Sequence, residues 1–222
     1  MKGKLYGIGV GPGDPELMTL KAVKTIQKCG VIAGQKTAFS IAGPLLDGKN
    51  LLECGFVMED DMKKRVEARI AAAGQIIAFL ETGRDVGFIT LGDPTIYSTY
   101  IYVHEIIVAK GYDAEIIPGV ASYAAAAAAL GVALCENNEA LTIIPAKHDV
   151  SIDALLDAPG NKVIMKSGEN LAYVLEKIKE RDRDAMVACR VGMAGQTLYR
   201  SIDEYDESPA TGYFTVAIVK ER

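Results

Sequence analysis

The stretch Leu5-Tyr6-Gly7-Ile8-Gly9-Val10-Gly11-Pro12-Gly13-Asp14-Pro15 decides the fold, because an apolar run leads directly into a glycine-rich turn. Residues 5–10 have the short apolar pattern of a buried strand. The glycines let the backbone turn sharply and approach a ligand closely. We expect Asp14 to cap a helix that starts at Pro15, since proline favours the first helical position. This stretch therefore predicts the strand, turn and helix that begin an α/β domain.

The same arrangement recurs twice further along the chain. The predicted strand Val86–Thr90 runs into Leu91-Gly92-Asp93-Pro94, and the predicted strand Ala114–Ile117 runs into Pro118-Gly119-Val120-Ala121-Ser122. Open α/β sheets bind ligands at the carboxyl ends of their parallel strands. Three glycine loops in succession therefore predict a binding cleft at that edge.

The remaining patterns alternate between helix and strand. Helices are predicted at about 19–28, 60–82, from Pro94 through Val108, and at 122–130, 152–156 and 170–180. Further strands are predicted at 31–33, 141–144, 162–165, 185–190, 196–201 and 213–219. The first half thus predicts a mostly parallel sheet, and the second half a mixed sheet that is antiparallel near the C-terminus. We expect an α/β fold of two α/β domains, residues 1–118 and 119–222.

Two common nucleotide-binding motifs are absent. A GxGxxG motif starting at Gly7 requires glycine where Pro12 stands, and one starting at Gly9 requires glycine where Asp14 stands. The second strand ends in Gly34-Gln35-Lys36, which offers no carboxylate to a ribose. No GxxxxGK[ST] occurs either. These patterns disfavour dinucleotide and ordinary nucleoside triphosphate binding.

The composition excludes several classes of protein. The net charge of −5 disfavours nucleic acid as a partner. The four cysteines contain no CxxC pair and the two histidines no HExxH, so we expect no metal site and a reducing, cytoplasmic setting. Twenty uncharged residues separate Glu115 from Glu136, but Pro118, Gly119 and Gly131 interrupt them. We therefore expect no contact with a membrane.

Taken together, the motifs resemble those of the tetrapyrrole methylase family, the S-adenosylmethionine (SAM)-dependent enzymes of sirohaem and cobalamin synthesis. The resemblance runs nearly from end to end and is carried by the order and spacing of its pieces. These are Gly9-Val10-Gly11-Pro12-Gly13-Asp14, Gly92-Asp93-Pro94 with Tyr97, Pro118-Gly119-Val120-Ala121-Ser122, Met165, and Gly192 through Gln196. Residues 5–17 and 34–37 look most like the branch that methylates C-20 of precorrin-2 or of its cobalt-loaded counterpart.

The resemblance implies a homodimer that binds SAM in a cleft between its two domains and the tetrapyrrole on the N-terminal side. Main-chain groups of glycine loops are suited to the amino-acid part of SAM, and Ile96 and Met165 offer apolar surface to the adenine or the thioether. The implied SAM-binding residues are Pro12, Leu91, Gly92, Asp93, Ile96, Ala121, Ser122, Met165, Gly192 and Thr215. Asp93 has an alternative role as the cap of the helix predicted from Pro94.

The implied reaction is methylation of a ring carbon, which then loses a proton. Asp14 is the candidate general base, and Tyr97 is the candidate hydrogen-bond donor to the substrate. Helix capping is the alternative role for Asp14, and packing in the core is the alternative for Tyr97. Lys36 and Lys166 are candidates for binding substrate carboxylates, and each has the alternative of an ordinary surface charge. Further candidates of this kind are Arg84, Lys147, His148 and Arg190.

Other functions remain open on the sequence alone. The same fold serves other precorrin methyltransferases, uroporphyrinogen-III methyltransferase and diphthine synthase, which modifies a protein. A carrier that binds SAM or a macrocycle without turnover is an alternative of a different class.

Overall fold

A computed structural model describes residues 2–56, 61–146, 151–206 and 212–221. The chain divides into two compact units, unit 1 (Met1–Ala121) and unit 2 (Ser122–Arg222). Each unit has its own five-stranded sheet. Within the described ranges, no helix is both long enough and apolar enough to cross a membrane.

The sheet of unit 1 is parallel throughout, which confirms the prediction for the first half. Its strand order is β3-β2-β4-β1-β5. The strands are β1 (Leu5–Gly9), β2 (Val31–Gly34), β3 (Asn50–Glu53), β4 (Val86–Thr90) and β5 (Ala114–Ile117). Since β1 and β4 lie side by side at the centre and are buried along most of their length, they form the core of the unit.

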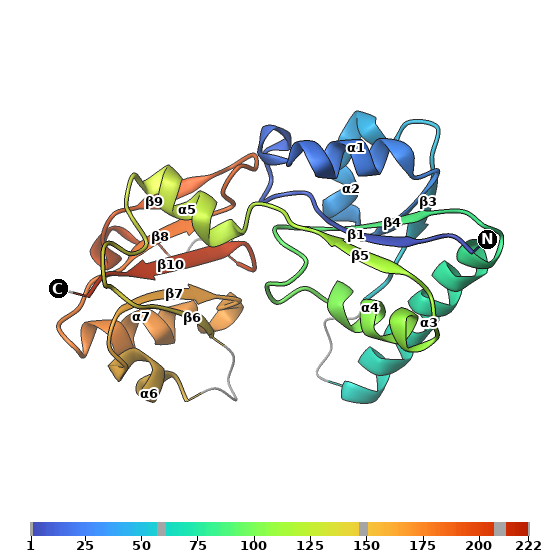
Figure 1. Cartoon of the computed structure of the whole chain (residues 1–222). Coiled ribbons are helices and arrows are strands. Elements are labelled where there is room, and N and C mark those ends of the chain that lie inside the picture. The colour runs from blue at the N-terminus through green and yellow to red at the C-terminus, as the bar shows by residue number, and fades with distance from the viewer. Residues whose placement is uncertain (1, 57–60, 147–150, 207–211, 222) are drawn as a thin grey trace. The chain divides into compact units, whose positions relative to one another are not determined.

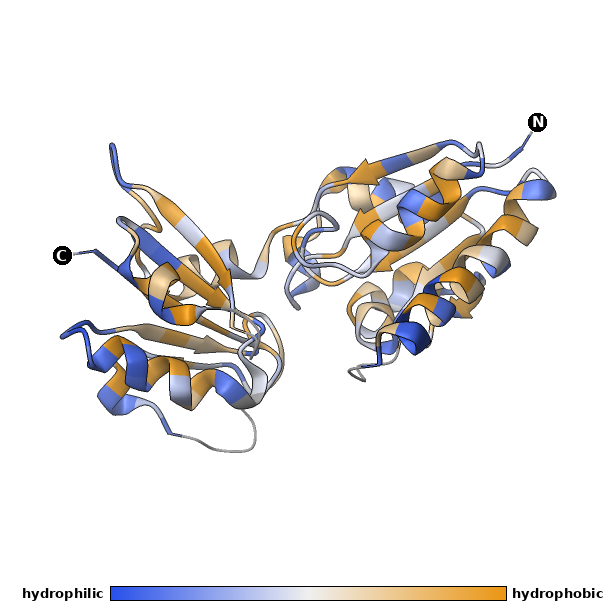
Figure 2. Cartoon of the chain, turned by 90° about the horizontal axis from the view of Figure 1, so that it is seen from below, coloured by the Kyte–Doolittle hydropathy of each residue, from blue (hydrophilic) through white to orange (hydrophobic). Residues whose placement is uncertain are grey.

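Helices cover both faces of this sheet (Figure 1). α1 (Leu20–Lys28) and α2 (Lys36–Ala42) lie on one face, and α3 (Met62–Glu81) and α4 (Tyr100–Ala109) on the other. Short 3-10 helices lie at Pro15–Leu17 and Gly43–Leu46. Figure 2 shows that the strands of the sheet are largely apolar, whereas the helices carry both apolar and hydrophilic residues. The sheet is therefore the buried layer of unit 1.

The helix predicted from Pro94 through Val108 is present as α4, but its predicted start is wrong, because α4 begins only at Tyr100. Asp93 uses its side chain to accept hydrogen bonds from the amide of Thr95, at 2.8 Å, and from the amide of Gly119 on a different loop, at 2.9 Å. Tyr97 then adopts a left-handed backbone with φ of 49°, which no α-helix contains. The turn is thus held by a contact that is distant in sequence. Capping of an α-helix by Asp93 is wrong for the same reason.

Two elements of unit 1 escape the sequence patterns. α2 is only seven residues long, and β3 lies at the edge of the sheet with mostly exposed residues. Short elements with few apolar positions give weak periodicity. In contrast, the helix predicted at 19–28 matches α1 closely, since Thr19 caps it by accepting a hydrogen bond from Ala22 at 3.1 Å.

The sheet of unit 2 is mixed, as predicted for the second half. Its order is β6-β7-β10-β8-β9, in which β6 and β7 are parallel and the other neighbours are antiparallel. The strands are β6 (Leu141–Pro145), β7 (Asn161–Met165), β8 (Met186–Cys189), β9 (Thr197–Tyr199) and β10 (Thr215–Val219). β10 is buried along its whole length and forms the centre of this sheet.

Helices also cover both faces of the second sheet. α5 (Ser122–Leu130) lies on one face, and α6 (Ile152–Asp157) and α7 (Leu171–Lys179) lie on the other (Figure 1). Short 3-10 helices lie at Gly168–Asn170 and Ile202–Glu204. The predicted helices at 122–130, 152–156 and 170–180 are therefore confirmed to within a few residues.

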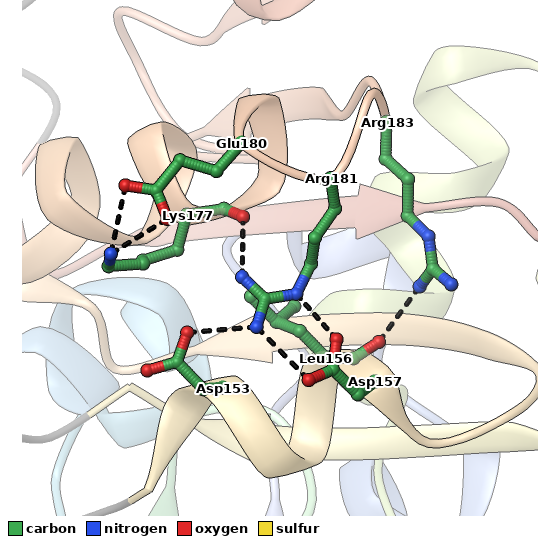
Figure 3. Close-up of polar contacts among 7 residues, drawn as sticks. All are labelled: Asp153, Leu156, Asp157, Lys177, Glu180, Arg181 and Arg183. Atoms are coloured by element: carbon green, nitrogen blue, oxygen red, sulfur yellow. Dashed lines mark hydrogen bonds and ion pairs between the residues drawn. The ribbon is translucent and has the colours of Figure 1, made fainter.

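A polar clamp fastens α6 to the end of α7 (Figure 3). The guanidinium of Arg181 donates to Asp153 at 2.9 Å, to Asp157 at 2.6 Å and to the main-chain carbonyl of Lys177 at 2.9 Å. The hydrogen bond from Arg181 lowers the pKa of the Asp157 carboxyl below its usual value. Arg183 adds a bond to the carbonyl of Leu156 at 2.8 Å. In the sequence, Arg181 of the clamp precedes the amino end of β8, whereas Arg190 and Gly192 follow its carboxyl end.

Candidate functional site

Three glycine loops meet at the carboxyl edge of the sheet in unit 1. From β1 the chain passes through α1 to β2 on one side, whereas from β4 it passes through α4 to β5 on the other. β1 and β4 are neighbours, so their carboxyl ends form the switch point of the topology. Ligands bind at such points in open α/β sheets, because the diverging loops leave a crevice there.

The first two loops are joined directly by their main chains. The amide of Gly92 donates to the carbonyl of Gly11 at 2.7 Å, and the amide of Gly11 donates to the carbonyl of Gly92 at 3.3 Å. The amide of Val10 donates to the carbonyl of Thr90 at 3.0 Å. The ladder of the parallel sheet thus gives way to a reciprocal bridge, which fixes the distance between the loops.

The third loop packs against both of the others. A Cβ atom placed on Gly119 lies 2.2 Å from the carbonyl oxygen of Gly92 and 2.8 Å from the carbonyl carbon of Gly9. A Cβ atom placed on Gly9 lies 2.5 Å from the same oxygen of Gly92. No side chain fits at these two positions, because all the neighbouring atoms are main-chain atoms. The predicted convergence of the three loops within this unit is confirmed.

Asp93 ties the second loop to the third with its carboxylate. One oxygen accepts from Thr95 through both the amide and the hydroxyl, and the other oxygen accepts from the amide of Gly119 at 2.9 Å. Hydrogen bonds to a carboxylate are stronger than those between neutral groups. Asp93 therefore positions the main chain of the two loops.

The other residues predicted in unit 1 gather around these loops. Pro12 is buried within the first loop, Leu91 and Ile96 are partly exposed in the second, and Ala121 is partly exposed after the third. Tyr97 is 39% exposed, so its alternative role as a core residue is wrong. The buried aromatic residue of this segment is Tyr100.

The two candidate catalytic side chains differ in chemistry. Asp14 accepts a hydrogen bond from the amide of Glu16 at 2.8 Å and caps the 3-10 helix that starts at Pro15, which confirms its capping role. Partial burial raises the pKa of the Tyr97 hydroxyl above its usual value. Tyr97 is therefore protonated near neutral pH, which suits a hydrogen-bond donor and not a base.

In unit 2, three predicted residues share one edge of the sheet. Met165 at the end of β7 pairs with Val216, and Thr215 at the start of β10 pairs with Cys189 at the end of β8. Gly192 follows β8 after three residues, and its amide donates to the side chain of Gln196 at 2.8 Å. Ser122 lies at the start of α5 and is partly exposed.

The basic candidates have different surroundings. Lys36 is exposed at the start of α2 and forms an ion pair with Glu53 at 3.6 Å. Lys166 follows β7 directly and has a left-handed backbone with φ of 53°. Arg84 precedes β4 and so lies at the amino edge of the sheet, away from the glycine loops. Lys147 and His148 lie outside the described residues.

Two further residues, Ser167 and Arg190, lie at the same edge of the sheet in unit 2. The sequence patterns do not predict Ser167, and they give Arg190 only as one of several further carboxylate-binding candidates. The side chain of Ser167, two residues after β7, is 3% exposed, and its hydroxyl has no hydrogen-bond partner in the described part of the chain. Arg190 directly follows β8 and has φ of 52°. No sequence motif marks either residue, since a lone serine or arginine at the end of a strand is common.

The family comparison decides the class of the protein. A model of the tetrapyrrole (corrin/porphyrin) methylases matches residues 4–204. The chain belongs to the tetrapyrrole methylase family. The members of this family are SAM-dependent methylases, so the expected family and enzyme class are confirmed.

Several curated members of the tetrapyrrole methylase family match this chain along almost all of its length. A probable cobalt-precorrin-2 C(20)-methyltransferase of Methanocaldococcus jannaschii is 34% identical over 98% of this chain and 96% of its own. The cobalt-precorrin-2 C(20)-methyltransferase of Salmonella typhimurium is 27% identical and is covered to 98%. The precorrin-2 C(20)-methyltransferase of a Sinorhizobium species is 27% identical and is covered to 95%.

Solved structures of tetrapyrrole methylases have the same fold. A cobalt precorrin-4 methyltransferase superposes with a TM-score of 0.78 at 21% identity, covering 98% of this chain and 94% of its own. A uroporphyrin-III C-methyltransferase from Thermus thermophilus, complexed with S-adenosylhomocysteine, gives 0.72 at 15% identity, with 99% and 98% covered. The expected α/β fold with one parallel and one mixed sheet is therefore confirmed.

Proposed function

We propose that this chain transfers a methyl group from SAM to C-20 of precorrin-2 or of its cobalt-loaded counterpart, in cobalamin biosynthesis. The observation that carries the proposal is the junction of three glycine loops at the switch point of a parallel sheet, in a chain of this family. The curated relatives described above bear the names of C-20 methyltransferases and match nearly the whole chain, which favours this reaction over others in the family.

The residues present fit SAM as the methyl donor. Gly9 and Gly119 keep side chains away from the junction, so main-chain groups can approach the amino-acid part of the donor. Partly exposed Ile96 and Met165 supply apolar surface. In unit 1, the proposed donor-binding residues are Pro12, Leu91, Gly92, Asp93, Ile96 and Ala121. In unit 2, they are Ser122, Met165, Gly192 and Thr215.

The chemistry demands orientation more than acid catalysis. When bound, SAM supplies an electrophilic methyl group whose bond to sulfur breaks as a bond to the ring carbon forms. The protein holds the two reactants in line, and such positioning accounts for a large share of the rate in bimolecular reactions. Asp14 accepts the proton that the methylated carbon loses, and Tyr97 donates a hydrogen bond to the macrocycle.

The substrate carries several carboxylates, while the protein has a net charge of −5. We assign Lys36 and Lys166 to carboxylate binding, with the macrocycle mainly on the side of unit 1. Replacing either lysine with glutamate is expected to raise the KM for the macrocycle and to leave the affinity for SAM unchanged. Equal KM values in wild type and both variants contradict this assignment.

The decisive experiment supplies the enzyme with SAM and either metal-free or cobalt-loaded precorrin-2. We expect S-adenosylhomocysteine and a singly methylated macrocycle to appear together, with the methyl group at C-20 by NMR. A carrier binds without releasing S-adenosylhomocysteine, and a protein methylase releases it only with a protein substrate. Methylation of uroporphyrinogen III without methylation of precorrin-2 favours the alternative function of a uroporphyrinogen-III methyltransferase.

The assembly and its setting are also proposals. We expect a homodimer in the cytoplasm, as the family resemblance implies. Light scattering coupled to size-exclusion chromatography measures the mass directly, and a mass of 23.7 kDa, that of one chain, contradicts the dimer.

A further inference from the structure

The loop after β8 is built to hold one arginine in place. The amide of Arg190 donates to the carbonyl of Phe214 at 2.7 Å, and the carbonyl of Arg190 accepts from the amide of Met193 at 2.9 Å. Gly192 bonds to the side chain of Gln196 across the same loop at 2.8 Å. Arg190 also has a left-handed backbone, with φ of 52°, which is uncommon for a residue with a side chain. The main chain of Arg190 is thus fixed at both of its polar groups.

The side chain of Arg190 is fixed at one of its three nitrogens. Nε donates to the carbonyl of Ala194 at 2.9 Å, within the same loop. No residue in the described part of the chain forms a hydrogen bond or an ion pair with the two terminal nitrogens. Arg181 is different, because two aspartates and a carbonyl engage its guanidinium (Figure 3). The guanidinium of Arg190 is therefore held through Nε, and its two terminal nitrogens can donate hydrogen bonds to a ligand.

Arg190 lies at the edge of unit 2 that carries the proposed donor-binding residues. It directly follows Cys189, whose strand partner is Thr215, and Gly192 follows two residues later. Met165 lies at the same edge, through its pairing with Val216. A guanidinium matches a carboxylate with two parallel hydrogen bonds, and a fork that is already held loses less conformational freedom on binding.

We infer that Arg190 binds a carboxylate of one of the two reactants through its terminal nitrogens. The inference rests on the proposed function, which supplies two sources of that group: the methionine carboxylate of the donor and the acidic side chains of the macrocycle. Both offer the same chemistry to the arginine. The experiment below separates the two sources.

The test compares wild type with Arg190→Gln and Arg190→Lys, and with Lys179→Gln as the control. Lys179 is an exposed cation at the end of α7 that pairs with Asp203, so its replacement removes one charge away from this edge. Calorimetry measures the affinity for S-adenosylhomocysteine and for methylthioadenosine, which lacks the carboxylate. Initial rates at saturating SAM give the KM for the macrocycle.

A contact with the donor is expected to weaken S-adenosylhomocysteine binding by about ten- to a hundredfold in Arg190→Gln, with methylthioadenosine unaffected. A contact with the macrocycle is expected to raise its KM by a similar factor, with both nucleoside affinities unaffected. In either case the lysine variant recovers part of the loss, because it keeps the charge and loses the fork. Methylthioadenosine binding also reports whether the site is still intact.

Unchanged values for all three ligands in Arg190→Gln overturn the inference and leave the proposed function standing. If Arg190→Gln weakens methylthioadenosine binding as much as S-adenosylhomocysteine binding, the arginine acts by shaping the loop, which also overturns it. Absence of S-adenosylhomocysteine binding by the wild type overturns the proposed function instead.

Discussion

Replacing Gly119 with alanine tests the junction of the three loops. The added Cβ lies 2.2 Å from the carbonyl oxygen of Gly92 and 2.8 Å from the carbonyl carbon of Gly9, and real Cβ atoms do not approach other atoms that closely. Because both neighbours are main-chain atoms, the third loop itself must move by about 1 Å. That movement stretches the bond of 2.9 Å between the Gly119 amide and Asp93.

The cost of Gly119→Ala has two parts. Overpacking of a well-packed site costs about 1–3 kcal/mol, and loss of a hydrogen bond to a charged group costs about 1.5–3 kcal/mol. Since the two share one displacement, their simple sum of about 2.5–6 kcal/mol is an upper estimate, and we expect the free energy of unfolding to fall by about 2–5 kcal/mol. This is a large part of the stability of a typical domain, about 5–15 kcal/mol. The displaced loop is also expected to weaken S-adenosylhomocysteine binding more than tenfold.

Gly74→Ala is the matched control for Gly119→Ala. Gly74 is exposed within α3, and a Cβ there meets no atom within 4 Å. Alanine in a helix is favoured over glycine by about 1 kcal/mol, so this variant is expected to be more stable and to bind normally. Urea unfolding and calorimetry on both variants measure the two quantities. If Gly119→Ala has the same unfolding free energy and the same S-adenosylhomocysteine affinity as wild type, the close packing of the three glycine loops is refuted.

Three further predictions concern single side chains. Asp14→Asn keeps a residue that can cap the 3-10 helix, so we expect the stability of the protein and its affinity for S-adenosylhomocysteine to be unchanged. We expect kcat to fall about a hundredfold or more, because the proposed base is lost. An unchanged kcat excludes Asp14 as the base. Ser167→Ala removes a buried hydroxyl that has no partner in the described ranges, so we expect the free energy of unfolding to rise by about 1 kcal/mol. Ser98→Ala removes a hydroxyl that has hydrogen-bond partners and is expected to lower the free energy of unfolding. A lower free energy of unfolding in both variants contradicts the prediction. Hydrogen bonds from Lys220, Asn161 and the amide of Glu136 lower the pKa of Glu139 from 4.5 to about 2. The contribution of Glu139 to stability is therefore present above pH 4.5 and is lost as the pH falls through 2. Acid titration of Glu139→Gln is expected to show a smaller loss of stability over this range than wild type, and identical acid unfolding curves argue against this prediction.

The sequence predicts the sheets well because their signals are local. Short, mostly apolar runs of four or five residues that lead into glycine-containing loops mark β1, β4 and β5 without any knowledge of their neighbours. The parallel arrangement of unit 1 follows from the alternation of such runs with helical patterns. The mixed sheet of unit 2 follows likewise from three closing strands with little helix between them. The alternation of strands and helices is therefore readable from most of the chain.

The segment between β4 and α4 is not readable in this way. An aspartate followed by proline favours the start of a helix, and the sequence alone predicts one. In the folded chain the carboxylate of Asp93 is shared with Gly119, which is 26 residues away. In the same segment Tyr97 is exposed and Tyr100 is buried, although both are aromatic residues. Local propensity loses here to a tertiary hydrogen bond.

The construction of the loop junction also explains why a general base is harder to locate from sequence than the junction itself. Main-chain atoms and glycines join the loops, so the constraint on sequence falls on residues that lack a side chain. Gly9 and Gly119 are required by contacts at distances that exclude a Cβ. A solved structure that shares only 15% identity with this chain keeps its fold. A polar side chain such as that of Asp14 or Arg190 is common in any sequence, so its role is proposed from its position in the fold.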